Sequence, residues 1–151
     1  MGGVANAANM LRAEDFLKIA TEGRIEMHWK TYFTNTKGTG YLATADRAGK
    51  VDIAVYSRPH VFEDGTLAFG MGDRLTHANL AENPHAVYAF NEGHYQGVRL
   101  YLEKLREETS GLLLEEIRAN ADEIVGSGTA EFVKFVVHFR VVKDLPLVGT
   151  R

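Results

Sequence analysis

Residues 41–56 read YLATADRAGKVDIAVY and carry the most informative local pattern in the chain. The apolar run 41–45 is followed by Asp46-Arg47-Ala48-Gly49, a combination of residues typical of a tight turn. After the turn, Val51, Ile53 and Val55 occupy every second position, which is the periodicity of a half-buried strand. The pattern therefore predicts two antiparallel strands joined as a hairpin.

Short β-type segments continue along the chain, and most are bounded by turn residues. Val61-Phe62 leads into a second tight turn at Glu63-Asp64-Gly65, and further strands are expected at Thr66–Met71, Ala86–Phe90, 98–103 and Phe132–Val142. About six strands at this short spacing favour a closed antiparallel barrel over a parallel α/β sheet. On the last strand, His138 is expected to be outward-facing or half-buried. The acidic run Glu103, Glu107 and Glu108 is expected to be a solvated strand end.

Helices are expected between and before these strands. The first covers about 13–22, and residues 25–33 read either as a strand or as a loop over the barrel. A short helix over 74–82 has Asp73 as its expected N-cap and Asn83-Pro84 as its stop. A further helix covers about 111–124.

Composition limits the class of protein. The chain has 151 residues, no Cys and a formal net charge of -3. It is expected to be one domain, residues 1–151, with residues 1–12 as a flexible tail. The missing Cys excludes disulfides and thiolate chemistry, and the charge argues against a nucleic-acid partner. The sequence predicts no membrane span and no signal peptide, so a cytoplasmic protein is expected.

One strand-to-helix junction could bind an anion. Gly70-Met71-Gly72 ends a predicted strand, and the helix start beyond it carries Arg74 and Thr76. Unpaired backbone N–H groups at the start of a helix bind phosphate favourably. Arg58 follows the neighbouring strand, and its guanidinium could bind the same phosphate. In the alternative interpretation, Asp73 simply caps a connecting helix and both arginines are solvated.

Other catalytic and cofactor motifs are weak. The letters G-x-G-x-x-A at 38–43 precede a strand rather than a helix, which argues against a dinucleotide fold. The six His residues lack the spacing of a metal site, so no metal is expected. No nucleophile motif is present, and no catalytic residue can be named.

Three stretches together resemble the pyridoxamine phosphate oxidase-like, FMN-binding split-barrel family. They are Leu42–Asp52, Asp64–Phe69 and Thr76–Val87, the last containing Asn79-Leu80 and Asn83-Pro84. Gly97–Leu100 is similar to the family's strand near the dimer interface. The resemblance covers residues 40–106 well and the remainder only by architecture.

The resemblance implies a fold, a cofactor and an assembly. The fold would be a mainly β, six-stranded antiparallel split β-barrel of Greek-key type with a few short helices. The protein would be a homodimer with FMN in clefts at the interface, and Gln96 with Gly97 would come from the partner subunit. The cofactor-binding residues implied by position are Arg58, Pro59, His60, Val61, Gly70, Met71, Arg74, Leu75, Thr76, Asn79 and Gln96.

The chain departs from the family at the residues that would bind the phosphate of FMN. The family commonly has a Lys there, whereas this sequence has Leu75 and Thr76 after Arg74. It also lacks the C-terminal extension of the vitamin oxidases, which argues against oxidation of pyridoxine phosphate.

A flavin-dependent oxidoreductase acting on a small molecule is the leading hypothesis. The alternatives are a non-enzymatic module or redox carrier that binds flavin, haem or deazaflavin, and a cofactor-free structural dimer.

Overall fold

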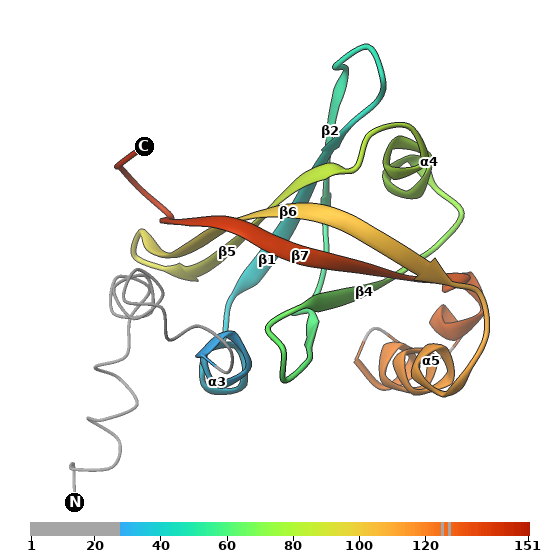
Figure 1. The fold of residues 1–151 in the computed structure, drawn as a ribbon. Helices are drawn as coiled ribbons and strands as arrows, with labels where there is room; N and C mark the ends of the chain where they lie inside the picture. The colour runs from blue at the N-terminus through green and yellow to red at the C-terminus, as the bar shows by residue number, and fades with distance from the viewer. Residues whose placement is uncertain (1–27, 125, 127) are drawn as a thin grey trace, which may run out of the picture.

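The structure is a computed structural model that describes residues 28–124, 126 and 128–151. The helix expected at 13–22 and the tail expected at 1–12 lie outside the described residues. The described chain contains seven strands, three α-helices and one 3-10 helix (Figure 1). In order they are α3 (His28–Asn35), β1 (Thr39–Ala45), β2 (Val51–Val55), β3 (His60–Val61), β4 (Leu67–Met71), α4 (Leu75–Glu82), β5 (His85–Gly93), β6 (Gln96–Glu108), α5 (Leu112–Ile124), the 3-10 helix η1 (Thr129–Phe132) and β7 (Phe135–Pro146).

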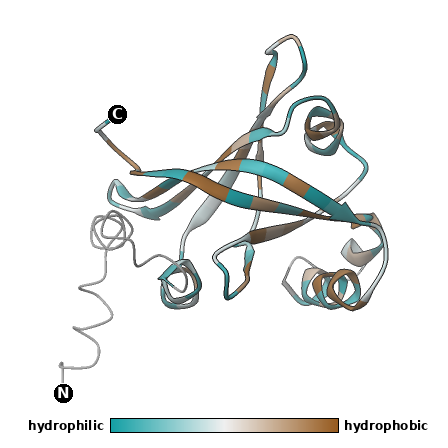
Figure 2. Ribbon diagram, viewed as in Figure 1, coloured by the Kyte–Doolittle hydropathy of each residue, from teal (hydrophilic) through white to brown (hydrophobic). Residues whose placement is uncertain are grey.

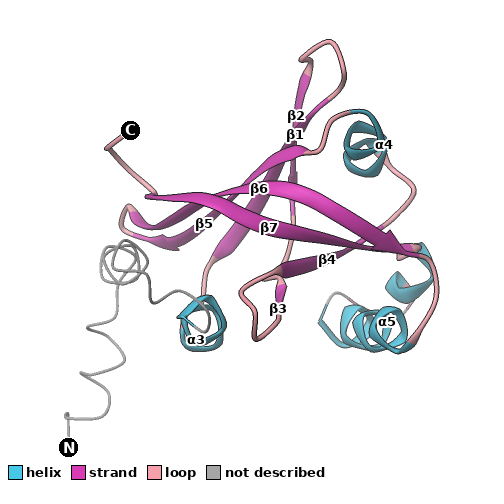
Figure 3. Cartoon of the chain, viewed as in Figure 1, coloured by secondary structure: helices cyan, strands magenta, loops and turns pink. Residues whose placement is uncertain are grey.

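All the described strands belong to one antiparallel sheet in the order β2-β1-β5-β6-β7-β4-β3 (Figure 3). The sheet has seven strands rather than the expected six, because two residues near Val61 pair with β4 as a short edge strand. The predicted hairpin is confirmed: β1 pairs with β2 from Tyr41 opposite Val55 to Ala45 opposite Val51. Its turn is held by Asp46, whose Oδ1 accepts hydrogen bonds from the backbone N–H groups of Ala48 and Lys50.

Residues 28–33, expected as a strand or loop, form the first half of helix α3. Trp29, Tyr32 and Phe33 are buried, and their spacing of three and four residues places them on one helix face. The apolar alternation through Met27, Trp29 and Phe33 fits a strand equally well over so short a stretch. The aromatic packing against the sheet decides for the helix, because Phe33 lies 5.4 Å from Phe90 between ring centroids.

Several predicted boundaries are wrong: the strand expected at 98–103 spans Gln96–Glu108 as β6, and the last strand ends at Pro146 rather than Val142. Asp73 is not the cap of α4: Arg74 is the N-cap residue and no side chain caps the helix. The last strand begins at Phe135 rather than Phe132, because residues 129–132 form η1.

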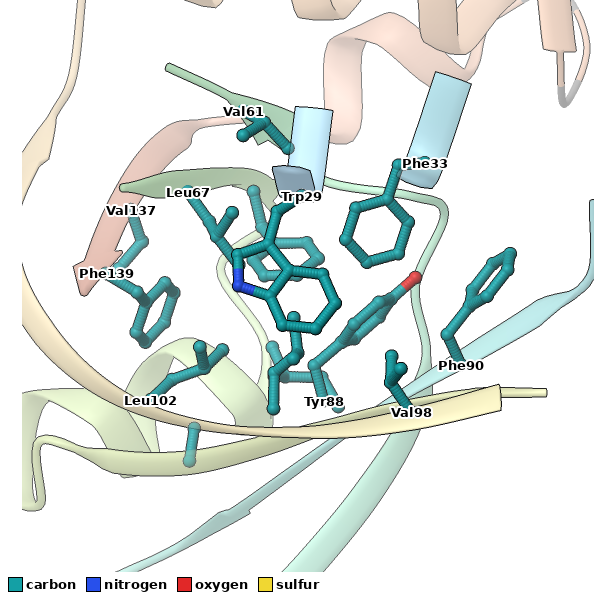
Figure 4. Packing of buried hydrophobic residues seen from close by; sticks show 14 of the residues in the cluster. Trp29, Phe33, Val61, Leu67, Tyr88, Phe90, Val98, Leu102, Val137 and Phe139 are labelled. Atoms are coloured by element: carbon teal, nitrogen blue, oxygen red, sulfur yellow. The ribbon is translucent and has the colours of Figure 1, made fainter. Parts of the chain in front are cut away.

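The hydrophobic core lies inside the curved sheet and is closed by α3 (Figures 2 and 4). Tyr88, Phe90 and Phe139 are fully buried there, and Trp29 lies over the middle of the cluster. A second cluster lies on the opposite face of the sheet. It joins Ala68 of β4, Val136 of β7 and Leu114 of α5, so α5 covers the outer face of these two strands.

Candidate functional site

A cavity of about 460 Å³ lies between the segment that links β2 to β3, the outer face of β4, and the α5–η1 region. In Figure 3, α3 and α5 flank β3 and β4 on opposite sides. The cavity is lined by Val55, Tyr56, Ser57, Arg58, Pro59, His60, Ala68, Phe69, Gly70, Glu116, Ile117, Asn120, Ala121, Thr129 and Val133. We call it the α5 cavity. Its floor is largely apolar, and polar side chains stand on both walls.

Small residues on β4 allow α5 to approach the sheet. A Cβ atom added at Gly70 would lie 2.5 Å from Ile117 Cγ2, and one added at Gly72 would lie 2.8 Å from the Phe132 carbonyl oxygen. The space beside these glycines is therefore filled by the chain's own α5–η1 region. Gly70 still lines the cavity at its edge.

Arg58 stands between the α5 cavity and a second hollow. Its Nη1 donates to the backbone carbonyls of Phe33 and Thr36, each at 2.8 Å, and so ties the segment to the end of α3. The second hollow, about 480 Å³, lies on the α3 side of the same segment, and Lys30 contributes to its lining. Pro59 and His60 line both spaces.

The residues predicted around the start of α4 are separate from the cavity lining. Arg74 is exposed, with its guanidinium carbon 5.7 Å from the Phe132 ring centroid, and Leu75 is also exposed. Thr76 and Asn79 are buried, and Asn79 Nδ2 donates to Thr44 Oγ1 at 3.1 Å.

Three other predicted residues lie elsewhere. Val61 and Met71 are buried in the inner core. Gln96 begins β6, next to the β5–β6 turn, at the opposite end of β5 from α4. Its expected contact with a partner's cofactor stays a prediction.

Four polar residues of the cavity wall were not predicted as site residues from the sequence: Ser57, Glu116, Asn120 and Thr129. Glu116 and Asn120 are four residues apart and therefore share one side of α5. That spacing is the only sequence signal for them, and it does not reveal which strand they face.

Helix α4 is joined to the sheet by a half-buried polar cluster. His77 stacks on Phe135 with 3.7 Å between ring centroids, and its Nε2 lies 3.0 Å from Glu107 Oε1. Lys104 Nζ donates to the same oxygen at 3.0 Å. Burial works to raise the pKa of Glu107, but the hydrogen bonds from Lys104 and His77 prevail and lower it. Glu107 is therefore paired with His77 of α4 and Lys104 of β6, and it is not the solvated residue that the sequence predicted.

His138 lies on the outer face of the sheet opposite Ala68, as expected, but it is buried there rather than half-buried. Its ring stacks on Phe62, and its Nε2 lies 2.5 Å from Glu108 Oε2. The hydrogen bond with His138 lowers the pKa of Glu108 below its ordinary value of 4.5. Glu108 is therefore also a paired residue within β6 and not a free strand end.

Acid should weaken the fold through Glu108. A carboxylate whose pKa is depressed in the folded state stabilises that state above its unfolded pKa, and this contribution is lost as the pH falls through the folded pKa. Glu108→Gln should accordingly flatten the loss of stability below about pH 4.5, measured by urea unfolding from pH 6 to 3. Glu63→Gln, an exposed position in the β3–β4 turn, is the control; equal slopes in both variants would contradict the assignment.

Metal and membrane features were sought in the part of the chain that the structure describes. Within it, no group of three or more His, Cys, Asp or Glu residues could hold a metal ion. None of its helices has both the length and the apolar character of a membrane span.

The chain has the split-barrel fold that solved structures of an FMN-binding protein and of candidate pyridoxamine 5'-phosphate oxidases share. An FMN-binding protein from Syntrophomonas wolfei is similar over 99% of this chain and 100% of its own, with a TM-score of 0.69 and 23% identity. A candidate pyridoxamine 5'-phosphate oxidase from Listeria innocua matches 83% of this chain and 99% of its own (TM-score 0.61, 13% identity). HutZ, the heme storage protein from Vibrio cholerae, matches 80% and 94% (TM-score 0.55, 15% identity). No family model and no curated protein sequence matches the chain.

Proposed function

We propose that this protein binds FMN in the α5 cavity and acts as a flavin-dependent oxidoreductase on a small molecule. The observation that carries the proposal is the cavity itself, which places an apolar floor beside Arg58 and His60 in a split-barrel fold. The likeness to the FMN-binding protein of Syntrophomonas wolfei over the whole chain supports the same ligand.

The residues present fit FMN in their chemistry. Val55, Ile117 and Val133 offer apolar surface to a ring system, and Ser57 and Asn120 offer hydrogen-bonding groups for its polar edge. Arg58 in the cavity lining and Arg74 outside it, at the start of α4, are the two arginines proposed for the phosphate, since guanidinium groups bind phosphate through paired hydrogen bonds. Pro59, His60 and Gly70 also line the α5 cavity, whereas Val61, Met71, Leu75, Thr76, Asn79 and Gln96 lie outside its lining.

FMN would supply the hydride or electron transfer, and the protein would position it. The β2–β3 segment would hold one side of the ligand, while α5 would exclude water from the other side. Because Arg58 is fixed by the carbonyls of α3, its guanidinium is already oriented before a ligand arrives.

We propose a homodimer, with the outer face of β2 and β1 as its interface. Val51, Ile53 and Val55 are exposed on one face of β2, and Tyr41 opposite Val55 extends this apolar surface onto β1. Val55 also lines the α5 cavity, so a partner bound to this face would border the cofactor site.

Ile53→Glu should disrupt this dimer without damaging the fold. The Ile53 side chain is 65% exposed in one chain, so the charge would be buried only on association. Sedimentation velocity at micromolar concentration should show a monomer for the variant and a dimer for the wild type. Leu112→Glu, at a position 91% exposed on α5, is the matched control. A wild-type monomer, or a dimer that persists in Ile53→Glu, would exclude this interface.

The first test of the function is the visible absorption spectrum of freshly purified protein. Flavin bands, and FMN released by heat, are the expected result. Protein purified without chromophore should bind added FMN with quenching of its fluorescence. The absence of both would overturn the proposal.

A non-enzymatic haem or deazaflavin module is the second candidate. His60 lines the α5 cavity and could offer an imidazole ligand to haem iron, and the likeness to HutZ favours this reading. A Soret band that is lost in His60→Ala would support haem. FMN bound without turnover of any nicotinamide nucleotide would support a flavin carrier instead.

A further inference from the structure

Helix α5 carries one carboxylate that faces the α5 cavity. Glu116 lines the cavity together with Asn120, one helical turn later. Its neighbour Glu115 does not line it and pairs instead with Arg118 at 3.2 Å. Asp122 is also occupied, because its Oδ1 accepts the backbone N–H of Ala130 at 2.9 Å.

The charge of Glu116 is not neutralised by an ion pair within residues 28–124, 126 and 128–151. The cation on the opposite wall, Arg58, uses its Nη1 for the carbonyls of α3. Glu116 and Arg58 are both exposed to solvent, and the apolar residues Ile117 and Val133 also line the cavity. Near a protein surface, unit charges about 4 Å apart still interact several times more strongly than in bulk water.

We propose that Glu116 holds the reduction potential of the flavin bound in the α5 cavity at a low value. This inference rests on the proposed function. Oxidised flavin that takes up two electrons and one proton gains one net negative charge on its ring. A nearby carboxylate disfavours that charge, so the protein would bind the oxidised form more tightly than the reduced form. The bound flavin would consequently be a stronger reductant than one in a neutral pocket.

The test compares Glu116→Gln with wild type and with Glu115→Gln. Both substitutions remove one carboxylate from adjacent positions of the same helix and keep the side-chain length. Reduction potentials would be measured by dithionite titration of FMN-loaded protein against a reference dye. FMN dissociation constants would be measured in parallel by fluorescence for the oxidised form.

Glu116→Gln should raise the potential, with the ratio of reduced to oxidised affinity increasing about tenfold. For a two-electron couple this corresponds to about 30 mV. Glu115→Gln should stay close to wild type, because its carboxylate lies outside the cavity lining and already faces Arg118.

The outcomes separate this inference from the proposed function. Wild-type protein that binds no FMN overturns the proposed function and the inference with it. FMN binding with equal potentials in wild type and Glu116→Gln overturns the inference alone. The inference is also overturned if Glu116→Gln and Glu115→Gln shift the reduction potential equally. The effect would then come from the net charge of the protein rather than from the position of Glu116.

Discussion

Replacing Arg58 and Arg74 together by alanine is expected to weaken FMN binding by at least about 100-fold. Each hydrogen bond from a charged group contributes about 1.5–3 kcal/mol. The loss of two such interactions would therefore reach about 3 kcal/mol or more, and about 1.4 kcal/mol corresponds to tenfold in affinity. Titration of FMN fluorescence with each protein measures the effect directly.

The single variants show which arginine binds the phosphate. Arg74→Ala is the clean test, because Arg74 is exposed and contacts the Phe132 ring without capping a helix through its side chain. Arg58→Ala also removes two hydrogen bonds to the end of α3, so its melting temperature must be compared with that of wild type. Arg47→Ala, in the β1–β2 turn, controls for net charge. A double variant that binds FMN as tightly as Arg47→Ala would refute the assignment of the phosphate site.

Gly97→Ala is expected to destabilise the fold by at least about 4 kcal/mol, a size reserved for severe defects. A Cβ atom at this position would lie 1.9 Å from the Phe90 carbonyl oxygen. That oxygen belongs to the backbone of β5, which pairs with β6 at Asn91 and Gly97. Rotation of a side chain therefore cannot relieve the clash. Urea unfolding followed by circular dichroism would show a lower midpoint or a protein that does not fold.

Gly93→Ala is the matched control for backbone strain. Both glycines have positive φ, 102° at Gly93 and 151° at Gly97, but an added Cβ at Gly93 meets nothing within 4 Å. Strain of this kind alone costs about 1–3 kcal/mol. Equal losses in the two variants would mean that the close approach to Phe90 is not what requires Gly97.

The sequence predicts most of the sheet because its turns are locally encoded. Asp46 binds the N–H groups of Ala48 and Lys50, so the residues that make the first hairpin lie next to one another in the chain. Helix α3 was missed because its identity depends on a distant contact, that of Phe33 with Phe90. A stretch of alternating aromatic residues does not contain this information.

The residues of the candidate site were likewise predicted only in part. Arg58, Pro59, His60 and Gly70 could be predicted as neighbours, because they flank one strand pair and the structure brings them to one cavity. Glu116, Asn120 and Thr129 could not be predicted, since they reach the cavity only when α5 packs on β4. Ala68 and Gly70 make that packing possible, but small residues on a strand do not specify what covers them.

The hydrogen bonds from Arg58 to the carbonyls of Phe33 and Thr36 link ligand binding in the α5 cavity to the local opening of α3. Local opening of α3 would release the Nη1 group from Phe33 and Thr36 and disturb the segment on which a ligand would rest. By thermodynamic linkage, a ligand that needs the closed segment must make that opening rarer. The amide protons of α3 would then exchange with solvent more slowly when the cavity is filled, although α3 contributes no residue to its wall.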